Sequence, residues 1–315
     1  MTTSNTVNAV NEVSDTLTLV HSAPTIRSVP SISSSAMLVE LNISNWSGRK
    51  KDRAASGEIT TSSQAEAGVA SVTKKLLGNS KELKDIQNFI NSARTIHTEM
   101  TMPWSNSGLR LLPTTFYFKY NERMSAAIGE FNTLVSVFLT SYSYEVARSQ
   151  VKLGNLFNID DYPTPESLQA KFGFHLNYLP LPDAGDFRID VANDAAAELR
   201  RDYEKLYADQ YNNAIKSIWN RVYGALAHMS ERLDYTDIAD RKIFHGALVS
   251  NVADMIGLLR SCNINNDSQM SAMADQLESA LSGVTPDGLR ADNHLRIETK
   301  RKVDAAIAAL PSLNI

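Results

Sequence analysis

One apolar stripe runs farther along the chain than any other. Between residues 192 and 235, apolar side chains recur every three or four positions and no proline interrupts them. This spacing is typical of one face of an α-helix, and at 1.5 Å per residue such a helix spans ~60 Å. The stripe consists of Leu199, Tyr203, Tyr207, Tyr211, Ile215, Ile218, Val222, Leu226, Met229 and Leu233.

A second long stripe predicts the partner of this helix. From about residue 114 to residue 153, bulky apolar residues again recur at helical spacing, and Thr114 or Thr115 can cap the first turn. A helix of this length buries its apolar face against another long element. We therefore expect 114–153 and 192–235 to form a long antiparallel helical hairpin.

Alternation with a period of two marks the extended segments. In 37–44, Val39, Leu41 and Ile43 alternate with polar residues, which is the pattern of a half-buried strand. The further extended segments are 109–112, 174–179 and 187–190. We expect these four segments to gather in a small antiparallel sheet that forms a compact base.

The other periodic segments predict shorter helices. A helix over 74–102 is interrupted at Gly78–Ser80, where Ser80 can cap the second part, and Pro103 ends it. The remaining helices are expected over 167–172, 243–260, 268–281 and 289–310. We expect 243–260 and 289–310 to pack back against the base. The fold class is mostly α with a small antiparallel β-sheet (α+β), with the long antiparallel helical hairpin on a compact base.

The start of the chain differs in composition from the rest. Residues 1–35 contain eight serines and six threonines but few bulky aliphatic side chains. So little apolar surface cannot offset the entropy lost on ordering, which predicts a flexible N-terminal arm. The alternative is an arm that orders when it pairs with a neighbouring subunit. Residues 36–315 then form a single elongated α+β domain.

Composition and charge exclude several classes of protein. The 31 Lys and Arg against 35 Asp and Glu give a net charge of −4, which argues against a wholly electrostatic, histone-like DNA binder. The single Cys262 excludes a disulfide framework and a cysteine-built zinc site. The first residues lack the basic and apolar regions of a secretory signal, and no segment approaches the ~20 apolar residues of a spanning helix. We expect a soluble protein of the bacterial host cytoplasm, with no membrane partner.

No sequence motif points to catalysis or to a bound metal. The chain has no phosphate-binding P-loop, dinucleotide-binding fingerprint, HExxH pair, nucleophile elbow or calcium loop. No two of its six histidines lie three or four residues apart. The acidic residues of 160–161 and 183–190 can coordinate a metal, but such residues before helices are more often caps and turn formers. The sequence predicts no catalytic residue, metal or cofactor.

Two local features have alternative interpretations. In 46–53, Trp46 stands beside Arg49, Lys50, Lys51 and Arg53. Four cations next to an aromatic ring can hold phosphates while the ring stacks a base, or they can form a solvated turn whose tryptophan anchors the sheet.

The second feature is an aromatic ladder in the long helix. Tyr203, Tyr207 and Tyr211 follow one another at intervals of four. They either pack in the core of the hairpin or form an interaction surface for a protein partner.

A family resemblance extends over about residues 37–310. The successive segments MLVELNISNWSGRKKDR, MPWSNSGLRLLP, LFNIDDYP, KFGFHLNYLPLPDAGDF and IWNRVYGALAHMSERL carry it. The chain resembles a family of tailed-phage and mobile-element proteins that has no established activity, so the resemblance implies no catalytic residues. Genes of this kind sometimes lie near a MoxR-type AAA+ ATPase and a von Willebrand-A-type protein, which implies an AAA+ ATPase as a partner.

These observations together favour a protein that works by contact. We expect a non-enzymatic phage or mobile-element accessory protein that acts through protein–protein contacts, either as an oligomer or as an adaptor of an AAA+ machine. The first alternative is a single-stranded nucleic-acid-binding protein of phage recombination or replication, with Trp46 stacking and the four neighbouring cations on phosphates. The second alternative is a structural component of the virion.

Overall fold

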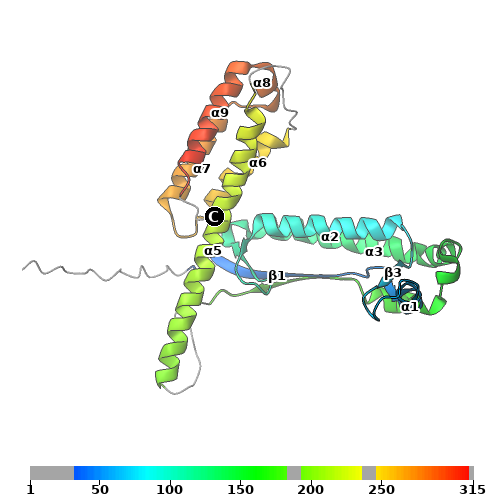
Figure 1. Ribbon diagram of the computed structural model, residues 1–315. Coiled ribbons are helices and arrows are strands. Elements are labelled where there is room, and N and C mark those ends of the chain that lie inside the picture. Colours follow the sequence, from blue (N-terminus) through cyan, green and yellow to red (C-terminus); the bar gives the residue numbers. More distant parts are fainter. Residues whose placement is uncertain (1–31, 183–192, 236–245, 312–315) are drawn as a thin grey trace, which may run out of the picture. The chain divides into compact units, whose positions relative to one another are not determined.

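The computed structural model describes residues 32–182, 193–235 and 246–311 (Figure 1). Contacts divide the chain between Pro30 and Ser31, and every described residue belongs to the second unit. The predicted strand 187–190, most of the predicted arm 1–35 and the first residues of the predicted helix 243–260 lie outside the described residues. Ile32, the first described residue, is fully buried.

The expected fold class, mostly helical with a small antiparallel sheet, is confirmed. Four strands form one sheet in the order β4-β5-β1-β6, and every neighbouring pair is antiparallel. A separate two-stranded sheet pairs β2 with β3. The strands are β1 (Ala36–Ser44), β2 (Arg49–Asp52), β3 (Val72–Lys75), β4 (Met102–Pro103), β5 (Arg110–Pro113) and β6 (Gly173–Leu179). The predicted extended segments 37–44, 109–112 and 174–179 therefore lie in one sheet.

The helices follow the predicted periodic segments closely. The longest, α5 (Asn193–Leu233), has almost the predicted bounds. The others are α1 (Arg53–Ser62), α2 (Lys81–Met100), α3 (Tyr117–Leu153), α4 (Pro165–Gln169), α6 (Ala247–Cys262), α7 (Ser268–Leu281), α8 (Pro286–Ala291) and α9 (Asn293–Ala308). The predicted helix 289–310 is in fact two, because Asp292 accepts hydrogen bonds from the backbone N–H groups of His294 and Leu295 and so begins α9.

Two predicted helix starts need correction. The helix expected from residue 74 begins only at Lys81, because residues 72–75 pair with β2 as β3. Its expected cap is right, since Ser80 Oγ accepts from the N–H of Leu83 at 3.4 Å. Neither Thr114 nor Thr115 caps α3; their hydroxyls instead donate to the carbonyls of Ser35 and Ser261, each at 3.1 Å.

The predicted pairing of 114–153 with 192–235 is wrong. In the described part of the chain, α3 packs along α2, whereas α5 packs along α6 and α9. The short strands β4 and β5 turn the chain back after α2. As a result α3 returns along α2, the helix that precedes it (Figure 1). The stripe of α5 is instead covered in part by α6, α9 and β4, and Leu199 of the stripe is exposed. The expectation that 243–260 and 289–310 pack on a base is also wrong, because their main partners are α5 and α7.

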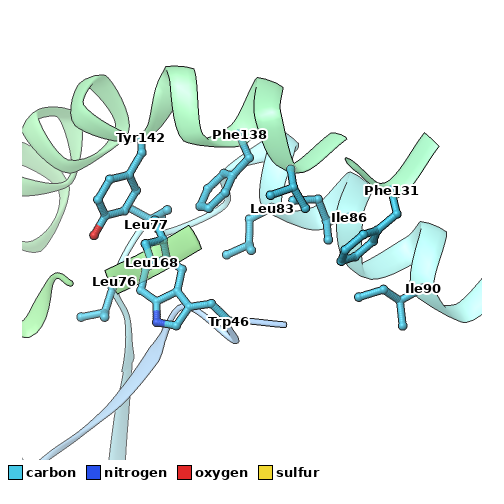
Figure 2. Packing of buried hydrophobic residues seen from close by; sticks show 11 residues of the cluster. Trp46, Leu76, Leu77, Leu83, Ile86, Ile90, Phe131, Phe138, Tyr142 and Leu168 are labelled. Atoms are coloured by element: carbon cyan, nitrogen blue, oxygen red, sulfur yellow. The ribbon is translucent and has the colours of Figure 1, made fainter. Parts of the chain in front are cut away.

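A shared apolar core joins α2, α3 and the start of the β2–β3 hairpin (Figure 2). Phe131, Phe138 and Tyr142 of α3 meet Ile86 and Ile90 of α2. A second cluster places Val39 and Leu112 of the sheet against Tyr120 and Met124 at the start of α3. The same helix therefore holds both the sheet and the hairpin in place.

A buried histidine makes this core sensitive to pH. His97 of α2 is buried and its Nδ1 lies 2.6 Å from the hydroxyl of Tyr120. Burial, with a smaller contribution from nearby Arg110, lowers the pKa of His97 from 6.5 to about 4. Below pH 6.5 the unfolded chain therefore binds a proton that the folded chain does not, which favours unfolding.

We expect the free energy of unfolding to fall by about 3 kcal/mol between pH 7 and pH 4, since each pKa unit corresponds to ~1.4 kcal/mol. Urea unfolding at several pH values measures how steeply the free energy of unfolding depends on pH, which is the slope compared below. His97→Gln flattens the slope between pH 6.5 and 4.5, whereas His175→Gln, at an exposed position of β6, leaves it unchanged. Equal slopes in the wild type and His97→Gln would show that another group is responsible.

Candidate functional site

The proposed role of Trp46 in stacking a base is wrong. Its indole is only 9% exposed and packs in the core between α2 and α3. The ring centroid lies 6.3 Å from that of Phe138 and 5.9 Å from that of Tyr142 (Figure 2). Both neighbours are core residues, so Trp46 serves as the anchor that fastens the β2–β3 hairpin.

Gly48 brings the hairpin close to α2. Its φ of +63° lies in the left-handed region, and a Cβ at this position would stand 2.7 Å from a methyl carbon of Leu83. Glycine adopts this conformation without strain, whereas any other residue here would be strained and would also require the Leu83 side chain to shift. The carbonyl of Gly48 also accepts from the N–H of Leu76 at 2.8 Å, which closes the start of the hairpin.

The predicted basic segment forms β2 and the first residue of α1. In the antiparallel register, Arg49 faces Lys75, Lys50 faces Lys74 and Asp52 faces Val72. Successive side chains of a strand point to opposite faces. The hairpin therefore separates its cations into two sets, one on each face.

On one face the cations are neutralised. Asp161 lies 2.7 Å from Lys50 Nζ and 2.6 Å from Lys74 Nζ, and Asp52 lies 3.2 Å from Lys74 Nζ. Lys74 also donates to the carbonyl of Leu156 at 2.9 Å. The hydrogen bond with Asp161 is the main reason that the pKa of Lys74 is raised. Lys50, predicted as a phosphate ligand, is thus committed to an ion pair.

Burial opposes ionisation of Asp161, but hydrogen bonds from Lys50 and Lys74 outweigh it and keep the pKa of this carboxyl below its usual value. The carboxylate comes from the turn Ile159–Asp161, which follows α3 in the chain. It therefore fixes the hairpin to a segment far away in sequence.

On the other face the cations are open. Arg49, Lys51 and Lys75 are all exposed, and within residues 32–182, 193–235 and 246–311 none of them forms an ion pair. Arg53, the fourth predicted cation, is exposed at the start of α1. Lys75 was not predicted as part of this site, because the sequence was interpreted as helix at that position.

The tyrosine ladder is not an open surface. Tyr207 is 1% exposed and Tyr211 is 7% exposed, while Tyr203 is half-buried. The ring of Tyr207 makes an edge contact with Trp104 at 5.2 Å between centroids, and burial raises the pKa of Tyr211 to about 12. The prediction of an interaction surface for Tyr207 and Tyr211 is therefore wrong, because they pack inside the molecule.

The structure exposes a different surface, on α3. Val137 is 54% exposed, Tyr144 is 68% exposed and Val151 is 87% exposed. These three residues lie seven apart, on the side of α3 opposite to Phe131 and Phe138. The sequence held a signal for this surface, since residues 131–144 contain no charged side chain, but the predicted hairpin accounted for it as core.

Comparisons with protein-family models, curated proteins and solved structures found no significant match. The resemblance to a tailed-phage or mobile-element family therefore stays a prediction. Among the described residues, no three His, Cys, Asp or Glu side chains lie together in a way that could hold a metal ion. No described helix is both long and apolar enough to cross a membrane. Cys262 is buried, and burial raises the pKa of its thiol to about 12.

Proposed function

We propose that the protein acts through protein–protein contacts as a homodimer, with the outward face of α3 as the contact surface. We define this α3 face as Thr133, Val137, Thr140, Tyr144, Ala147 and Val151, all of which are exposed. The observation that carries the proposal is the absence of charged side chains from residues 131–144 of α3, half of which are exposed. The adaptor role towards an AAA+ machine and the virion role rest on the family resemblance alone.

The α3 face lacks the charges of a solvated surface. Half of the fourteen residues in 131–144 are exposed, yet none of these fourteen is Asp, Glu, Lys or Arg. The solvent side of an amphipathic helix usually carries charged residues. A face that combines valines and a tyrosine with small hydroxyl side chains resembles the apolar core of an interface.

The spacing of the α3 face favours another helix as its partner. Its six residues follow one another at intervals of four and three, which is the repeat of a helix that packs along a second helix. Thr133, Thr140 and Ala147 alternate with the larger Val137, Tyr144 and Val151. Small residues opposite large ones let two copies of the same face interdigitate.

Charge at the ends of the α3 face selects a second copy in antiparallel orientation. Glu130 lies near one end and Arg148 near the other, on the same edge of the helix; Arg148 lies 3.4 Å from Glu145 of its own helix and keeps its side chain 55% exposed. An antiparallel pair centred near Leu139 brings Glu130 of each copy beside Arg148 of the other. A parallel pair would place like charges together. A two-fold dimer repeats this favourable contact on both sides of its axis.

Disulfide cross-linking tests this arrangement. Thr140→Cys lies near the proposed two-fold axis, so oxidation joins two copies. Ala126→Cys lies on the same side of α3, but an antiparallel pair separates its two copies by about 39 Å, far beyond the reach of a disulfide. Native Cys262 is buried and gives no background. Cross-linking of both variants would indicate a parallel pair, and cross-linking of neither would contradict the proposed contact.

A further inference from the structure

We infer that the open face of the β2–β3 hairpin binds the phosphodiester backbone of duplex nucleic acid. We define this basic face as Arg49, Lys51 and Lys75. The inference goes beyond the proposed dimer and does not depend on it, because the basic face and the α3 face lie on different elements.

The contrast between the two faces of the hairpin carries the inference. Lys50 and Lys74 on one face are held by Asp52 and Asp161, so their charges are satisfied within the molecule. Arg49 and Lys75 stand directly opposite each other on the other face, and neither forms an ion pair with a carboxylate of the described residues. Like charges in a directly opposed pair destabilise a sheet. An external anion between them removes that repulsion.

The basic face continues into a hollow beside the start of α2. The hollow has a volume of about 560 Å³, and Arg49, Lys75, Lys81 and Lys84 line it. Lys81 is paired with Asp85 at 2.5 Å, whereas Lys84 is exposed and forms no ion pair in the described part of the chain. The N–H groups at the start of the twenty-residue α2 add to the positive potential.

The extent of the basic face favours a polymer over a small anion. Arg49 and Lys51 are two residues apart on one strand, which separates them by about 6.6 Å, and Lys75 is on the neighbouring strand about 4.8 Å away. The cations thus form an extended surface and not a closed cage. Phosphates repeated along a backbone can meet all three at once.

The hairpin offers nothing that holds an unstacked base. Its only aromatic residue, Trp46, is buried in the core. Binding of single strands relies on aromatic rings that stack the bases. The basic face can therefore contact phosphates without distinguishing sequence, and it favours a duplex, which has the higher charge density.

Fluorescence anisotropy with a labelled 20-base-pair DNA duplex tests the inference on the full chain. Three phosphate contacts predict an affinity that falls about 40-fold between 50 mM and 200 mM salt. The variant Arg49→Ala/Lys51→Ala/Lys75→Ala should lose binding at both salt concentrations. The control Arg200→Ala/Arg201→Ala/Lys205→Ala removes three exposed cations from α5 and should bind as the wild type does. Equal loss in both variants would show only an effect of net charge and would overturn the inference.

Further measurements distinguish duplex nucleic acid from single strands and from other polyanions. Each single strand of the duplex should bind more weakly than the duplex itself, and a single strand that binds equally well contradicts the assignment to duplex. Polyglutamate of matched charge should compete less strongly than the unlabelled duplex, and equally strong competition contradicts the assignment to nucleic acid. The variant Val137→Glu/Tyr144→Glu should keep the same salt dependence, which separates this inference from the dimer. Circular dichroism confirms that each variant is folded.

Discussion

Val137→Glu/Tyr144→Glu should convert the dimer to a monomer. The double substitution places four carboxylates, two from each copy, at the centre of the proposed interface. The carboxylate at position 137 loses its water without a cation on its own helix within one turn, whereas the carboxylate at position 144 lies one turn from Arg148. Removing an unpaired charge from water costs several kcal/mol, so the two carboxylates at position 137 carry the expected effect. Each 1.4 kcal/mol weakens the dimer tenfold, so we expect association to be lost at all accessible concentrations.

A matched control separates this effect from a general effect of added charge. Ile297 of α9 is 54% exposed, as Val137 is, but it lies outside the α3 face. Ile297→Glu should leave the mass of the dimer unchanged. Light scattering coupled to gel filtration measures all three proteins. A double variant that remains as large as the wild type would place the contact elsewhere.

Phe138→Ala should have the largest effect on stability. Phe138 is fully buried where α2, α3 and Trp46 meet, and its ring also contacts Tyr142 and Phe172. Removing the ring leaves a cavity between elements that cannot collapse freely. Substitutions of this kind lower the free energy of unfolding by about 3–5 kcal/mol.

Phe118→Ala gives the matched control for this prediction. It removes the same side chain from the same helix, but Phe118 is 82% exposed. We expect a change within about 0.5 kcal/mol. Urea unfolding at a single protein concentration measures both variants, because dimer formation makes the stability depend on concentration. Similar losses in the two variants would contradict the assignment of Phe138 to the core.

Local pattern was sufficient to predict most of the elements. The bounds of α5 and α7 and the alternation in β1 follow directly from apolar spacing. Lys74 and Lys75 were misassigned because the apolar pair Leu76–Leu77 fits either a helix or the end of a strand. The deciding contact is the pairing of β3 with β2, more than twenty residues earlier in the chain.

The choice of partners could not be predicted. Both α3 and α5 carry a long apolar stripe. Apolar spacing shows that such a helix face is buried, but it does not show which other helix packs against it. The same limit applies to the basic hairpin, because the sequence does not show which of its four predicted cations form ion pairs within the molecule. Only the fold brings Asp161 to Lys50 and Lys74 and leaves Arg49 and Lys51 open.

Sedimentation equilibrium of the wild-type protein tests the central claim most directly. The claim is that the α3 face is covered by a second copy of the chain. The chain has a mass of 34.7 kDa, so we expect a single species of twice that mass that dissociates on dilution. A mass of one chain at every concentration would contradict the account.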